Sequence, residues 1–115
     1  MSWDVKLISE TGRIVEVKRH FEGGTYVIEG TSVAELNITY NYSTLFREYL
    51  HPDGLKWIHG KKAREVLPAF INSVDQLGNI KDEDYWKDTK GNAGFALSIL
   101  ARWAKANPDA MFLVS

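Results

Sequence analysis

The chain has 115 residues, of which 44% are hydrophobic and 25% charged, with a formal net charge of −1 and no cysteine. This length suits a single domain, 1–115, whose core needs neither disulfides nor a metal. The absence of cysteine excludes disulfides, thiolate zinc sites and cysteine nucleophiles, and the near-neutral charge argues against sequence-specific nucleic-acid binding.

The first ten residues, MSWDVKLISE, carry two acids and no long apolar run. Secretion signals and membrane spans both require such a run. We therefore expect a cytoplasmic protein without a membrane partner, and the missing cysteines agree with a reducing compartment.

The first half of the chain predicts β-strands. Alternating apolar residues on both sides of Gly12 predict a hairpin over 5–17. A run of β-forming residues follows at 25–29, and 33–42 is the longest expected strand. Short turns join these segments, so we expect an antiparallel β-meander.

The second half predicts helices. A short helix is expected at 45–50, and 61–77 has apolar residues at helical spacing over four turns. Pro68 lies inside this second segment and predicts either a kink or a division into two helices. The last helix is expected at 92–106. Strands followed by helices predict an α+β fold, with the N-terminal meander packed on one face by helices from the C-terminal half.

Polar and apolar residues alternate along LNITYNYS, residues 36–43. Because successive side chains of a strand point to opposite faces, the segment predicts one apolar and one polar face. The apolar face, expected against the helices, holds Leu36, Ile38, Tyr40 and Tyr42. The polar face, expected to point outward, holds Asn37, Thr39 and Asn41. Asparagine is a poor strand residue, so this row is either a binding surface or a solvated face whose amides bond to nearby turns.

Residues 82–95, DEDYWKDTKGNAGF, hold a second concentration of polar and aromatic side chains. The adjacent rings of Tyr85 and Trp86 could stack on a ligand. A glycine-containing turn at a helix start can bind an anion through its free N–H groups. The residues expected at this turn are Lys90, Gly91 and Asn92.

The same segment also allows a purely structural interpretation. Thr89 or Asn92 would supply the oxygen that caps the last helix, and Trp86 would pack in the core. The acids of the segment lack the spacing of a calcium loop, so we expect no metal.

Enzyme motifs are missing from the sequence. The three histidines are scattered, without the spacing of metal ligands, and no local signature marks a nucleophile; they are His20, His51 and His59. We therefore expect neither an enzyme nor a cofactor.

Five short motifs together suggest a family. They are GGTY at 23–26, GT at 30–31, NITYNY at 37–42, YW at 85–86 and GNA at 91–93. From about residue 23 to residue 100 the chain resembles a family of small uncharacterised proteins from tailed phages and bacterial prophages. It departs from the pattern at 30–31, where a double glycine is expected. The resemblance implies a phage accessory gene and a bacterial cytosol, but no catalytic residue, because the family has no assigned activity.

Three functions remain open. The first is a phage accessory protein that binds a host protein through the Asn37, Thr39 and Asn41 face. The second is a binder of a small phosphorylated ligand or nucleotide, held by Tyr85 or Trp86 and the turn at 90–92. The third is a hydrolase without a recognisable motif. The sequence allows a monomer or a homodimer, and leaves open whether the two segments form one site.

Overall fold

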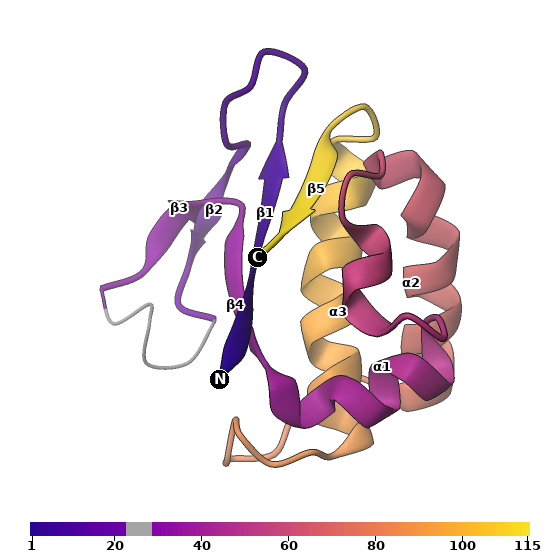
Figure 1. Ribbon diagram of the computed structural model, residues 1–115. Coiled ribbons are helices and arrows are strands. Elements are labelled where there is room, and N and C mark those ends of the chain that lie inside the picture. The colour runs from indigo at the N-terminus through magenta and orange to yellow at the C-terminus, as the bar shows by residue number, and fades with distance from the viewer. Residues whose placement is uncertain (23–28) are drawn as a thin grey trace.

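The computed structural model describes residues 1–22 and 29–115 (Figure 1). Its larger sheet is antiparallel, with strand order β4–β1–β5. The central strand is β1 (Ser2–Ile8), flanked by β4 (Glu35–Thr39) and β5 (Met111–Val114). Residues 25–28 of the strand expected at 25–29 lie outside the described residues.

The hairpin expected around Gly12 is confirmed. The Ser9 N–H donates to the Arg13 carbonyl at 2.7 Å, and the Gly12 N–H donates to the Ser9 carbonyl at 2.9 Å. Gly12 has a φ of 84°, a conformation that glycine adopts without the steric penalty of a Cβ atom. The turn therefore depends on the residue that predicted it.

A second, two-stranded sheet follows this hairpin. It pairs β2 (Glu16–His20) with β3 (Thr31–Val33) in antiparallel fashion. The two sheets meet at Leu7, whose N–H donates to the Ala34 carbonyl at 3.0 Å and whose carbonyl accepts the Val15 N–H at 2.9 Å. The pair β2–β3 is therefore attached to the larger sheet at one end.

The helices come from the second half of the chain. They are α1 (Ser43–Tyr49), α2 (Ala63–Leu77) and α3 (Lys90–Ala106). Short 3₁₀ segments at Tyr40–Tyr42 and Gly54–Ile58 precede and follow α1. Figure 1 shows the helices on one face of the larger sheet, so the predicted α+β fold with antiparallel strands is confirmed. The strands do not follow one another as a single meander, because β4 pairs with β1 and not with β3. The sequence did not predict β5, which returns from the helices to pair with β1.

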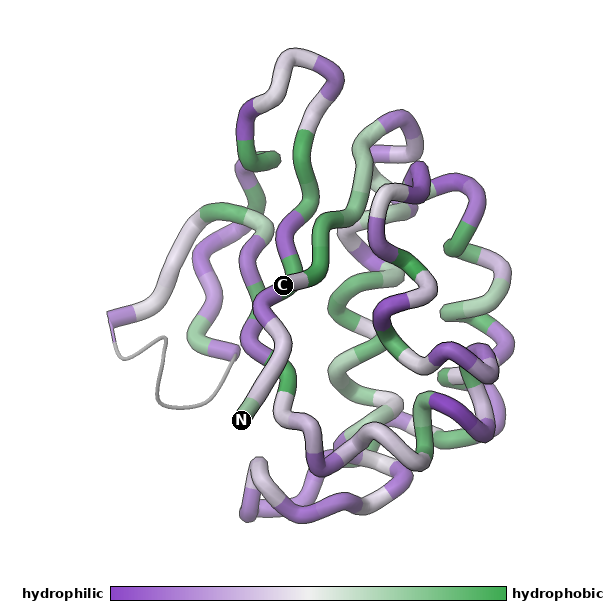
Figure 2. Tube along the Cα trace, in the orientation of Figure 1, coloured by the Kyte–Doolittle hydropathy of each residue, from purple (hydrophilic) through white to green (hydrophobic). Residues whose placement is uncertain are grey.

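The core lies between the sheet and the helices. Trp3 and Val5 of β1 are paired with Ile38 and Leu36 of β4, so these four side chains share the inner face. The largest helical side chains buried against them include Phe46, Phe70, Leu97 and Leu100. Figure 2 shows hydrophobic stretches on the central strands and alternating hydropathy along the helices. Across 1–22 and 29–115, no helix is long and apolar enough to cross a membrane.

The long helices follow the predicted segments closely. α2 is one helix over Ala63–Leu77 and continues through Pro68, so a division into two helices is wrong. α3 begins at Lys90, two residues earlier than expected, and ends before Asn107, which precedes Pro108 as predicted.

The strand expected over 33–42 is wrong at both ends, because Val33 belongs to β3 in the smaller sheet and β4 begins only at Glu35. β4 stops at Thr39, and the chain turns through the 3₁₀ segment Tyr40–Tyr42 directly into α1. The cause is local, because the Thr39 hydroxyl accepts the Asn41 N–H at 3.2 Å and caps the turn. The alternation at 36–43 therefore describes a strand only as far as Thr39, and Tyr40, expected on the inner apolar face, is 37% exposed.

Candidate functional site

The polar face expected to point outward is largely internal. Asn37 is 5% exposed, and its Nδ2 donates to Ser2 Oγ at 2.8 Å and to Asp4 Oδ1 at 3.0 Å. Asp4 lies directly opposite Asn37 in the β1–β4 register. Thr39 is 1% exposed and caps the 3₁₀ turn. The prediction of an exposed polar face is therefore wrong at Asn37 and Thr39, because β1 and the turn already bind these side chains.

Residues 37–42 lie in direct contact with 85–86. The exposed Asn41 donates from Nδ2 to the Trp86 carbonyl at 2.8 Å. The buried Tyr42 donates its hydroxyl to the Tyr85 carbonyl, and the Tyr85 hydroxyl donates to the Asn37 carbonyl. These three hydrogen bonds, which we call the clasp, join the two segments that the sequence nominated separately.

Burial affects both tyrosines of the clasp. Removal from water raises the pKa of the Tyr42 hydroxyl well above its usual range, and nearby Tyr85 and Asp84 raise it further. Burial raises the pKa of Tyr85 to about 12. Both hydroxyls therefore keep their protons and act as donors at neutral pH.

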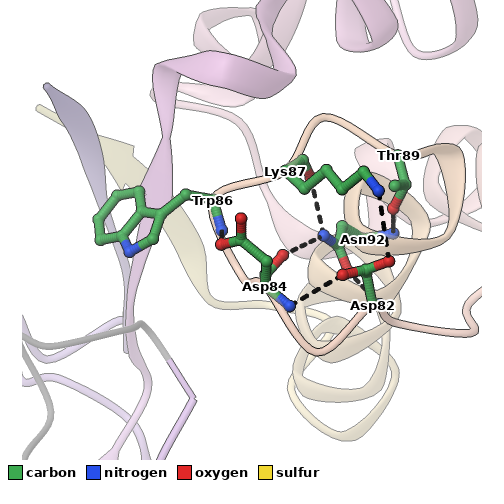
Figure 3. A network of polar contacts seen from close by, with 6 residues as sticks. All are labelled: Asp82, Asp84, Trp86, Lys87, Thr89 and Asn92. Carbon is green, nitrogen blue, oxygen red and sulfur yellow. Dashed lines mark hydrogen bonds and ion pairs between the residues drawn. The ribbon is translucent and has the colours of Figure 1, made fainter.

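Asn92 anchors the loop between α2 and α3 (Figure 3). Its Oδ1 accepts the Asp82 N–H at 2.7 Å, and its Nδ2 donates to the carbonyls of Asp84 at 3.0 Å and Lys87 at 2.7 Å. The Asn92 N–H donates to Thr89 Oγ1 at 3.0 Å, so Thr89 caps α3 as the structural interpretation predicted. The amide of Asn92, 4% exposed, is fully engaged inside the chain.

Gly91 allows close packing at the place where an anion was expected. A Cβ atom at Gly91 would lie 1.9 Å from the Ile80 carbonyl oxygen, and one at Gly94 would lie 1.6 Å from the Gly78 carbonyl oxygen. The segment 78–80 therefore lies directly against the first turns of α3. Because the Ile80 carbonyl oxygen carries partial negative charge, it disfavours an anion beside Gly91.

The side chains of Trp86 and Lys90 lie away from the Asn92 network and contact other aromatic rings. In Figure 3 the Trp86 ring points away from the Asn92 network, and it packs edge to face on the Tyr85 ring with 5.1 Å between the ring centres. Trp86 is 37% exposed, so the interpretation that placed it in the core is wrong. The Lys90 ammonium lies 5.3 Å from the centre of the Tyr49 ring on α1. The interaction with the Tyr49 hydroxyl raises the pKa of Lys90. A pocket lies beside the clasp, and neither Trp86 nor Lys90 is among the described residues that line it.

That pocket has a volume of about 340 Å³ and lies between β4, α3 and the loop that carries Tyr85. Two of the predicted site residues, Tyr85 and Asn92, line it. Its other apolar and aromatic lining residues are Phe21, Leu36, Tyr42, Phe95, Ala96 and Ile99. Phe95 and Ile99 were not among the predicted site residues, although their spacing of four places them on one face of the helix expected at 92–106.

Four charged residues also line the pocket. Glu22, Asp82 and Glu83 provide three carboxylates, and Lys81 provides one ammonium group. We call these four residues the mouth. The Lys81 ammonium lies 4.7 Å from the centre of the Phe95 ring, within the range of a cation–π interaction. The mouth carries more negative than positive charge.

A second hollow of about 600 Å³ continues along the C-terminal half of α3. It shares Phe21 and Glu22 with the pocket and contains His20 and Trp103, whose rings lie 5.3 Å apart. One face of α3 therefore lines two neighbouring hollows.

The histidines take part in separate local contacts. His20 contacts the Val33 carbonyl at 3.3 Å and Glu22 Oε2 at 3.3 Å, and His51 stacks on Trp57 at 4.6 Å. His59 Nδ1 accepts the N–H of Val114 in β5 at 2.9 Å. Among the residues that the structure describes, no group of three His, Asp or Glu side chains could hold a metal ion.

The candidate site is therefore the pocket and its mouth, with the clasp forming one of its walls. Comparisons of the chain with protein-family models, with curated proteins and with solved structures found no match.

Proposed function

We propose that this chain is a phage or prophage accessory protein that acts in the bacterial cytoplasm by binding a host protein at the pocket. The phage origin rests on the resemblance of its sequence motifs. The binding role rests on one observation of the structure: an apolar pocket opens beside Phe21, which is 63% exposed. Exposed aromatic side chains next to a hollow are typical of the centre of a protein interface.

The hydrogen bonds that the predicted polar residues make inside the chain support binding at the apolar pocket and not at a polar surface. The amides of Asn37 and Asn92 and the hydroxyls of Tyr42 and Tyr85 all donate within the chain. The groups available to bind a partner protein are therefore the apolar side chains of the pocket and the charged groups of the mouth. A partner would bury an apolar side chain in the pocket and contact Phe21 at its edge.

The proposal can be tested with two matched variants that each remove an exposed apolar side chain. Phe21→Ala changes the pocket, whereas Ile71→Ala changes an α2 residue that is 56% exposed and distant in the chain. Wild type and both variants are used as bait in a bacterial lysate, and captured proteins are quantified. We expect at least one protein to bind wild type and Ile71→Ala but not Phe21→Ala, and then to bind as a purified protein in calorimetry. If Phe21→Ala retains every captured protein, the proposed site is wrong.

The size of the pocket favours one alternative, a small ligand. About 340 Å³ is within the range of small-molecule pockets, roughly 300–1,000 Å³. A phosphorylated ligand is a poor fit, because the mouth is acidic and the Ile80 carbonyl lies beside Gly91. Native mass spectrometry of gently purified protein tests this alternative. A bound mass that Ala96→Met abolishes, by filling the pocket, would support it.

A further inference from the structure

We infer that the partner segment entering the pocket carries an apolar side chain next to a lysine or arginine. This inference rests on the proposed function and specifies the chemistry of the partner. It is carried by the pocket interior, by the charge of the mouth and by the position of Lys81.

The interior selects an apolar group. Among the protons that face the pocket, those of the Tyr42 and Tyr85 hydroxyls and of the Asn92 amide are donated to carbonyls of the chain itself. A polar group placed among Leu36, Phe95 and Ile99 would lose its hydrogen bonds to water without replacement. The inserted group is therefore an aliphatic or aromatic side chain.

The mouth selects a positive charge. Glu22, Asp82 and Glu83 oppose a single Lys81, and these carboxylates are only partly neutralised. Asp82 has Lys87 as a distant partner, 3.9 Å away, and Glu22 lies 3.3 Å from His20. Glu83 makes no ion pair with any residue that the structure describes. A cation at the mouth gains Coulomb energy, whereas a phosphate or carboxylate is repelled.

Lys81 shows where such a cation fits. Its ammonium lies over the Phe95 ring at 4.7 Å, so the chain itself places a positive charge at the edge of the apolar interior. A lysine or arginine of the partner would take the same position and displace Lys81. The side chain of Lys81 therefore competes with the partner for the Phe95 ring.

Three capped dipeptides test the charge preference: N-acetyl phenylalanyl-lysine amide and the same compound with glutamine or glutamate in place of lysine. Binding to the full chain is followed by heteronuclear NMR. We expect the lysine peptide to bind about fivefold more tightly than the glutamine peptide, as one or two exposed ion pairs allow, and the glutamate peptide to bind most weakly. The shifted signals should include those of Phe95, Ala96 and Ile99. Added salt should reduce the preference.

Variants of the mouth sharpen the test. The double variant Asp82→Asn and Glu83→Gln keeps the oxygen of residue 82 that accepts the Asp84 N–H, and should abolish the preference for lysine. Glu10→Gln, in the hairpin turn, should leave the preference unchanged. Lys81→Met removes the competing cation and should tighten binding of the lysine peptide by a few-fold.

Three other results of the peptide titrations would contradict the inference, the protein partner or the binding site. Equal binding of the three peptides at the pocket would overturn the charge preference while leaving the pocket as a binding site. Tighter binding of phenethylammonium than of the lysine peptide would replace the protein partner with a small amine. No shift of pocket signals with any probe, up to its solubility limit, would overturn both the inference and the proposed binding site.

Discussion

Two groups of polar residues lie within one small region and behave differently. The amides and hydroxyls of the clasp and of the Asn92 network are bonded to the chain's own backbone and to β1. The carboxylates of the mouth line an apolar pocket and have few partners among the described residues. The amide and hydroxyl donors of the first group are bonded inside the chain, although the buried Asn37 Oδ1 has no hydrogen-bond partner among the described residues. Internal bonding of the donors therefore separates structural from recognition roles, and the rarity of a residue type in a strand does not distinguish them. Substitutions in the first group should change stability, and those in the second should change binding.

The largest effect is expected at Gly94. Gly94→Ala places a methyl group 1.6 Å from the Gly78 carbonyl oxygen, so the segment 78–80 must move away from α3. We expect the free energy of unfolding, measured by urea denaturation, to fall by about 3 kcal/mol or more. Gly60→Ala is the control, because its φ of 76° is strained but no atom lies within 4 Å, and it should cost about 1 kcal/mol. Equal losses in the two variants would contradict the close packing.

Asn92→Ala comes next. The substitution removes three side-chain hydrogen bonds and leaves the Asp82 N–H without an acceptor, whereas the Asp84 and Lys87 carbonyls keep one backbone N–H donor each. We expect a loss of about 2–3 kcal/mol in denaturant unfolding. Asn72→Ala, at an exposed position of α2, should stay within about 0.5 kcal/mol of wild type. A small loss at Asn92 would mean that its network does not hold the loop.

The tyrosines of the clasp predict a dependence on alkaline pH. Unfolded tyrosine ionises near pH 10, whereas burial raises the folded pKa of Tyr85 to about 12 and that of Tyr42 further. As pH rises, the unfolded chain releases these protons first, so stability that is complete below pH 10 should decline between pH 10 and 12. Tyr85→Phe should lose about 1 kcal/mol at neutral pH and show a shallower alkaline decline. An equally steep decline in this variant would assign the effect to other groups.

The smallest effect is expected at Asn41. Its hydrogen bond to the Trp86 carbonyl, 2.8 Å long, is exposed to solvent. Asn41→Ala should therefore cost about 0.5–1 kcal/mol and leave dipeptide binding unchanged, as measured by denaturation and by NMR titration. A loss as large as that of Asn92→Ala would place Asn41, and not Asn92, at the centre of the polar structure.

The sequence predicted the features that depend on local patterns. The hairpin at Gly12, the extent of α2 and α3 and the Thr89 cap all follow from residues close together in the chain. The end of β4 escaped prediction because the alternation continues past Thr39, while the Thr39 hydroxyl stabilises a turn. β5 was not predicted, because it has only four residues and pairs with β1, which lies far away in the sequence.

The candidate site was predicted only in part. Tyr85 and Asn92 do line a pocket, but their hydrogen bonds span 48 residues to Asn37 and 10 residues to Asp82, and no periodicity reveals such pairs. The pocket itself combines β4, the 3₁₀ segment Tyr40–Tyr42, residues 21–22 after β2, the loop before α3 and one face of α3. Residues such as Glu22 and Phe95 acquire a shared environment only after these five segments have packed together.

The position of β5 has a consequence for folding. Asp4 in β1 exchanges two backbone hydrogen bonds with Ser115, at 2.8 Å and 3.0 Å, so one edge of β1 is closed by residues 111–115, more than 100 positions further along the chain. Contacts of such high sequence separation slow folding, since a long loop must close before they form. During synthesis β1 therefore waits with an unpaired edge until 111–115 have been made, and an unpaired edge is where strands of different chains associate. Until 111–115 have been made, the growing chain is therefore open to misassembly at this edge of β1.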